Sequence, residues 1–143
     1  MFCKNKDLRF FFSEIAKENI AKLAPRCETA QKLIGVMQQN YCVIENIVSY
    51  PKEDDRGFVT MQACDNMVIG LLAANRTSQY LPSDKIIRAM QSLFPGRKAI
   101  LLMYEKSDDK HLIHPFIHQI NGKMRILESV ELVMYKKYLN KTI

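Results

Sequence analysis

The chain has no tryptophan, and its five glycines are scattered rather than gathered into one loop. Neither GxGxxG nor GxxxxGK[ST] occurs, so the sequence contains no glycine-rich loop for holding a phosphate group. No apolar run approaches the roughly 18 residues that a membrane-spanning helix needs. The longest, residues 67–74, has the length of a strand. We therefore expect neither a P-loop nucleotide site nor a membrane partner.

Cysteine is also too sparse to suggest a disulfide framework. Cys3, Cys27, Cys42 and Cys64 all lie in the first half of the chain, whereas disulfide-stabilised domains are shorter and richer in cysteine. The N-terminal residues lack the apolar core and the small-residue cleavage site of a signal peptide. Together these features predict reduced thiols and a cytoplasmic protein.

The composition is that of one globular domain. The chain has 143 residues, of which 48% are hydrophobic and 25% charged, so it can bury a substantial core. Its formal net charge is +6, and the two ends carry the excess of basic residues. A basic balance of this kind permits an acidic partner, but it is equally common in soluble proteins that have none.

Residues 1–40 have the pattern of a helical hairpin. Leu8, Phe11, Phe12 and Ile15 follow helical spacing, and this predicts a helix from residue 8 to residue 23, with Asp7 as its N-cap. Pro25 ends that helix. The apolar positions between residues 26 and 39 predict a second helix packed against the first.

From residue 41 onward the pattern favours a sheet. Strands are expected at 41–50, 58–64 and 67–74, then a helix capped by Ser83 and ended by Pro95 and Gly96. Further strands are expected at 99–104, 111–120 and 123–128, followed by a helix at 129–139. Asn121 and Gly122 predict a hairpin, because type I′ turns need positive φ at two successive residues.

The predicted order is therefore ααβββαβββα. We expect a single α+β domain spanning residues 1–143, in which residues 1–40 form a helical hairpin lead-in. Residues 41–143 would form an antiparallel sheet with a crossover helix and a C-terminal helix. The layout is an architecture shared by unrelated proteins, so it does not identify a function.

No catalytic residue, metal site or cofactor is predicted. His111, His114 and His118 lie on a predicted strand, where His114 and His118 share a face but stand roughly 13 Å apart, too far for one metal ion. Cys42 and Cys64 fall on adjacent predicted strands, but their spacing matches no compact zinc site. We expect both to be buried thiols and the histidines to be half-exposed strand residues.

Aromatic residues outside the predicted core suggest a binding surface. Phe10 lies off the apolar stripe of the first predicted helix, Tyr80 lies in a loop, and Tyr138 lies near the C-terminus. Exposed aromatic anchors carry much of the energy of protein interfaces. The first hypothesis is therefore a non-enzymatic protein-binding module of the adaptor, inhibitor, immunity-protein or chaperone type, with a homo-oligomer as one possible form.

Two other hypotheses remain open. If the chain ends meet in space, their basic residues would form a face for nucleic acid. The residues concerned are Lys4, Lys6, Arg9, Arg97, Lys98, Lys136 and Lys137. The third hypothesis is a small-molecule sensor or small enzyme with a pocket between sheet and helices.

Overall fold

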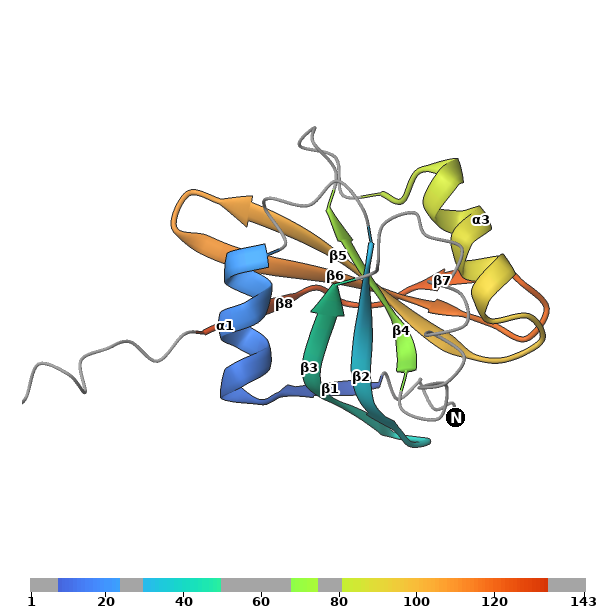
Figure 1. The fold of residues 1–143 in the computed structure, drawn as a ribbon, viewed down its shortest axis with the longest axis horizontal. Coiled ribbons are helices and arrows are strands. Elements are labelled where there is room, and N and C mark those ends of the chain that lie inside the picture. The colour runs from blue at the N-terminus through green and yellow to red at the C-terminus, as the bar shows by residue number, and fades with distance from the viewer. Residues whose placement is uncertain (1–7, 24–29, 50–67, 75–80, 134–143) are drawn as a thin grey trace, which may run out of the picture.

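The computed structural model describes residues 8–23, 30–49, 68–74 and 81–133. In chain order the elements are β1 (Arg9–Phe12), α1 (Glu14–Leu23), β2 (Gln31–Met37), β3 (Tyr41–Ser49), β4 (Val68–Ala74), α3 (Asp84–Leu93), β5 (Ala99–Ser107), β6 (Lys110–His118), β7 (Met124–Ile126) and β8 (Val130–Leu132). Figure 1 shows the strands as one curled sheet between α1 and α3. Neither helix of this described part is long and apolar enough to cross a membrane.

The sheet is mixed, with the order β1-β3-β2-β4-β5-β6-β7 and with β8 also paired to β6. β1 runs parallel to β3, and β4 runs parallel to β5, while the remaining neighbours are antiparallel. The predicted α+β fold with helices packed on an antiparallel sheet is therefore wrong, because strands dominate the described chain. β4 and β5 are parallel because α3, which lies between them in the chain, carries the chain back to the end of the sheet at which β4 began.

Arg9–Phe12 form a strand, so the helix predicted from residue 8 is wrong in its first turn. Phe11 is half exposed while its neighbours on both sides pack on the core, which is the alternation of a strand. The helix begins after Ser13, whose Oγ accepts the N–H of Ala16 at 3.0 Å. Asp7, the predicted cap, lies outside the described residues.

The second predicted helix is wrong over residues 31–37, which form β2, an interior strand of the sheet. This strand pairs antiparallel with both β3 and β4. A Cβ atom at Gly35 would lie 1.9 Å from the carbonyl oxygen of Val43, so the close approach of these strands requires glycine. The apolar spacing of residues 30–37 fits a helix equally well, and pairing with two neighbours decides in favour of a strand.

The helix predicted at 129–139 is wrong where the structure describes the chain. Val130–Leu132 form strand β8, which pairs antiparallel with β6 through Ile113 and the two residues before it. Residues from 134 onward lie outside the described ranges. Three residues are too few to show a periodicity of their own, so only the partner strand distinguishes this segment from a helix.

Several predicted elements are confirmed. β3 and β4 occupy the strands expected at 41–50 and 67–74, and β4 is buried on both faces, as its apolar run indicates. Helix α3 begins after Ser83, whose Oγ accepts the N–H of Ile86, and it stops before Gly96, which has a φ of +67°. The strand predicted at 58–64 lies outside the described residues.

The predicted hairpin at Asn121 and Gly122 is also confirmed, with a different turn. β6 and β7 pair antiparallel up to His118 and Met124. Gly122 has a φ of +87°, whereas Asp108 is the one described non-glycine residue with positive φ, so the turn is not type I′. Instead, Asn121 Oδ1 accepts the Lys123 N–H at 2.9 Å.

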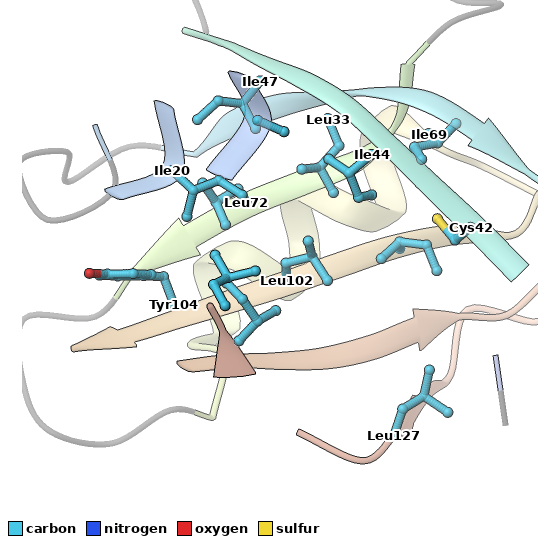
Figure 2. Packing of buried hydrophobic residues seen from close by; sticks show 14 of the residues in the cluster. Ile20, Leu33, Cys42, Ile44, Ile47, Ile69, Leu72, Leu102, Tyr104 and Leu127 are labelled. Atoms are coloured by element: carbon cyan, nitrogen blue, oxygen red, sulfur yellow. The ribbon is translucent and has the colours of Figure 1, made fainter. Parts of the chain in front are cut away.

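The two faces of the sheet bury separate apolar clusters. On one face, Ala16 and Ile20 of α1 pack among side chains from strands along the whole sheet. Figure 2 shows Ile20 of α1 next to Leu72 on β4, with Leu102, the register partner of Leu72, on the neighbouring β5. On the other face, Met90 of α3 and Phe94, which caps the end of this helix, cover the middle strands. Because the first cluster joins residues of β1 to residues of β6 and β8, the sheet must curl around it.

Gly70 on β4 should be intolerant of any side chain. A Cβ atom there would lie 1.8 Å from the carbonyl oxygen of Ile100 on β5. We expect Gly70→Ala to lower the free energy of unfolding by about 3 kcal/mol, because the two backbones would have to separate. Chemical denaturation of the purified variant measures this loss.

Gly96→Ala is the matched control for that substitution. Apart from its chain neighbours, no atom of the described residues lies within 4 Å of a Cβ at Gly96, so among them only its positive φ opposes alanine. Gly96→Ala should lower the free energy of unfolding by about 1 kcal/mol. Equal losses in the two variants would contradict the close approach of β4 and β5.

Candidate functional site

The most distinctive surface feature lies where the two ends of the curled sheet meet. A hollow of about 310 Å³ separates β1 from the segment that joins β7 to β8. It is lined by Leu8, Arg9, Phe10, Phe11, Glu128, Ser129 and Val130. The sheet order places β1 at one end and β7 at the other, so the hollow is a gap in a nearly closed sheet. We call it the seam hollow.

One edge of β1 is open within the described part of the chain. The N–H of Arg9 donates to the carbonyl of Asn40, and the N–H of Ser13 donates to the carbonyl of Ile44, both toward β3. Backbone groups alternate in direction along a strand, so those of Phe10 and Phe12 point away from β3. No described strand pairs with β1 on that side. β1 therefore presents unpaired donors and acceptors to an incoming strand.

Exposed apolar side chains accompany this edge. Phe11 is 50% exposed and Tyr41 on the neighbouring strand is 41% exposed. Their rings meet edge to face, with centroids 6.3 Å apart. Val36 on β2 is 41% exposed as well. Aromatic and apolar residues thus continue from the open edge across the outer face of β1, β3 and β2.

A chain of three polar side chains begins at the seam hollow. His114 Nδ1 lies 2.7 Å from Ser129 Oγ, and His114 Nε2 lies 2.7 Å from Glu105 Oε1. Ser129 is exposed on the wall of the hollow, whereas His114 is 8% exposed. The three residues come from β5, from β6 and from the residue before β8, so the pairing of these strands brings them together.

The hydrogen bonds in this chain have defined directions. An ionised carboxylate only accepts, so His114 Nε2 must carry the proton that is shared with Glu105. In a neutral imidazole the other nitrogen is then an acceptor, and the Ser129 hydroxyl donates to it. Glu105 thereby fixes the tautomer and orientation of the ring that faces Ser129.

The other two histidines have partners of their own. His111 Nδ1 lies 2.7 Å from the hydroxyl of Tyr104, and burial raises the pKa of that phenol. His118 is buried, and its Nδ1 lies 3.3 Å from the carbonyl oxygen of Arg97. The histidines therefore serve three separate contacts. Within the ranges that the structure describes, no three His, Cys, Asp or Glu side chains gather to hold a metal ion.

The residues predicted to bind a protein partner are only partly described. Phe10 lies on β1 rather than on a helix, is half buried, and lines the seam hollow. The prediction that Phe10 lies off the apolar stripe of a helix is therefore wrong, although Phe10 does border the open edge of β1. Tyr80 and Tyr138 lie outside the described residues.

The basic residues are likewise known in part. Arg9 and Lys98 are exposed, while Arg97 packs 5.3 Å above the ring of Phe94 and donates to the carbonyl of Val68. Three strands stand between β1 and β5 in the sheet, so Arg9 is not adjacent to Arg97. The remaining residues of the predicted basic face, Lys4, Lys6, Lys136 and Lys137, lie outside the described ranges.

Sequence reasoning missed Glu105 and Ser129. Glu105 pairs with Leu112 in the β5–β6 hairpin, which places it diagonally across from His114 on the same face. Counting outward from the tight turn at Asp108 would have found this neighbour. No such signal exists for Ser129, because the separate pairing of β8 with β6 brings it to His114.

A scan against models of known protein families finds no family that matches this chain, and a search of the curated proteins finds no significant relative. The interpretation of the site therefore depends on its geometry.

Cys42 should be inert in the folded protein. Its side chain is fully buried, and burial raises the pKa of its thiol to about 12. The reactive thiolate is thus almost absent at pH 8, where an unperturbed cysteine is partly ionised. We expect iodoacetamide to leave Cys42 unmodified under native conditions, as measured by mass spectrometry of the peptide that contains it.

Denaturant provides the control for this experiment, since Cys42 should react fully in the unfolded chain. Cys64, which the sequence places on the strand next to that of Cys42, lies outside the described residues. Rapid native alkylation at Cys42 would contradict its place in the core.

Proposed function

We propose that this chain is a protein-binding module that takes an extended segment of a partner protein along the open edge of β1. The observation that carries the proposal is that β1 pairs with β3 on one side and, among the described strands, with none on the other. Edge strands present unpaired N–H and carbonyl groups that can pair with another chain, and proteins usually shorten, charge or cover them. Adding a partner strand to such an edge is a recurrent mode of peptide recognition.

The backbone of β1 can supply part of the affinity. Phe10 and Phe12 each offer one N–H and one carbonyl to an added strand, and each new hydrogen bond contributes about 1 kcal/mol net. These groups alone give weak binding, so side chains must contribute the rest. Phe11 and Tyr41 are suited to this task because they are exposed, aromatic and adjacent.

The seam hollow indicates the chemistry of the partner segment. Leu8, Phe10 and Val130 give it apolar walls, while Arg9 and Glu128 stand exposed at its border. An extended segment places alternate side chains on opposite faces, so one apolar side chain would enter the hollow and the next would meet Phe11. The expected partner is therefore an extended apolar segment rather than a charged helix.

No observation on the described residues favours the nucleic-acid alternative over this one. A second copy of the chain could also supply the added strand, which would make the protein a homo-oligomer. The proposed location is the cytoplasm, and the free, buried thiol of Cys42 supports it.

A displayed library of random decapeptides provides the test. Peptides selected on the full chain should be extended and apolar, and their binding should slow hydrogen exchange at the amides of Phe10 and Phe12. Phe10→Pro removes the phenylalanine side chain and the outward backbone N–H, whereas Phe10→Ala removes the same side chain but keeps the N–H. The proline variant should bind a selected peptide roughly fivefold more weakly than the alanine variant, as measured by fluorescence anisotropy.

Equal affinity of the two variants, with no new protection at β1, would contradict strand addition. The amide of Phe11 is the internal control, because it faces β3 and should be protected with or without peptide. Sedimentation analysis across protein concentrations shows whether a second copy already occupies the edge. A salt-sensitive gel shift of a labelled oligonucleotide, abolished by reversing the charge of Arg97, would favour the nucleic-acid hypothesis instead.

A further inference from the structure

We propose that Ser129 is an activated serine that cleaves small carboxylic esters in the seam hollow, with His114 as its base and Glu105 as a positioning residue. The proposal depends on the hydrogen-bonded chain and on the hollow beside it. It shares the hollow with the proposed partner site, but it can be tested on the chain without a partner. It departs from the expectation of a chain without catalytic residues.

The chain of contacts has the order that nucleophilic catalysis requires. The Ser129 Oγ lies 2.7 Å from His114 Nδ1, which accepts the hydroxyl proton when the imidazole is neutral, and the opposite ring nitrogen lies at the same distance from the Glu105 carboxylate. A serine is a weak nucleophile until an adjacent base takes its proton, and a third group that orients the base completes the set. Here the serine bonds to Nδ1 and the carboxylate to Nε2, so the ring is reversed relative to the usual triad.

The placement of the three residues also follows this logic. The reacting hydroxyl is exposed on the wall of the hollow, its base is nearly buried, and the side chain of Glu105 is 28% exposed. The hydroxyls of Ser13 and Ser83, by contrast, cap helices α1 and α3. Ser129 caps no described helix, and its hydroxyl is directed at an imidazole instead.

The reaction balances with water as the only co-reactant. Ser129 Oγ forms a bond to the ester carbonyl carbon while its proton passes to His114 Nδ1. The carbon–oxygen bond to the alcohol then breaks, and the alcohol departs with that proton. Water, deprotonated by His114, next attacks the acyl-serine ester, releasing the carboxylic acid and restoring the Ser129 hydroxyl. Glu105 keeps its charge throughout and stabilises the imidazolium that forms in each step.

The hollow limits the class of ester. Its volume of about 310 Å³ is at the small end of ligand sites, and its apolar walls come from Leu8, Phe10 and Val130. A short aliphatic acyl chain therefore fits better than a long or charged one. Butyrate esters are suitable probes, whereas palmitate esters are too long.

Two probes test the proposal on the full chain. A fluorophosphonate forms an oxygen–phosphorus bond to an activated serine and expels fluoride, and p-nitrophenyl butyrate reports ester cleavage. We expect one adduct, located by mass spectrometry on Ser129 and absent from Ser129→Ala. His114→Gln should slow both reactions by about 10²-fold or more, because the base is lost. Ser92→Ala removes another exposed serine and should leave both rates unchanged.

Glu105→Gln separates positioning from mere structure. It should cause an intermediate loss of rate while its thermal midpoint stays near that of the native chain. It should also move the downfield proton resonance of His114 Nε2–H, since the charge-assisted hydrogen bond is weakened. If His114→Gln does not fold, labelling of Ser129→Ala and the reaction rates of Glu105→Gln still test whether Ser129 is the nucleophile and Glu105 positions its base. Equal labelling of native protein and Ser129→Ala, or unchanged rates in Glu105→Gln, would overturn the proposal.

Discussion

The burial of one apolar cluster determines the shape of this protein. On that face of the sheet, α1 is the one described helix that packs on the cluster, and it contributes Ala16 and Ile20. A single ten-residue helix cannot cover a flat sheet with this many strands, so the sheet curls until its two ends help to enclose the same side chains. Residues of β1, β6 and β8 thus come to share one core.

The candidate sites follow from this curl. The sheet bends far enough to bring β1 close to the segment before β8, but it does not close, and the seam hollow remains between them. An unfinished closure leaves the open edge of β1 with its backbone groups available. It also leaves Ser129 at the surface while His114, on the adjoining strand, is nearly buried. The two proposals, strand addition at β1 and ester cleavage at Ser129, therefore both depend on the same structural gap.

The candidate site was less predictable than the elements that form it. The sequence predicts Phe10 to be an aromatic residue off a helical stripe, yet its position beside the hollow comes from its place on an edge strand. His114 was expected to be half exposed and is instead nearly buried between Ser129 and Glu105. Its partners are 15 and 9 residues away in sequence, and only strand register joins them.

The sequence alone determined the local elements whose signals are carried by a few neighbouring residues. Neighbouring residues alone predict the helix cap at Ser83, the helix end before Gly96 and the turn at Gly122. The continuous apolar run likewise predicts the buried strand at 67–74. Tertiary structure decided whether residues 9–12, 31–37 and 130–132 form helices or strands, because their apolar residues alone do not distinguish the two. In these segments the pairing with a neighbouring strand determines the secondary structure, because a strand satisfies its backbone hydrogen bonds only with a neighbour that lies far away in sequence.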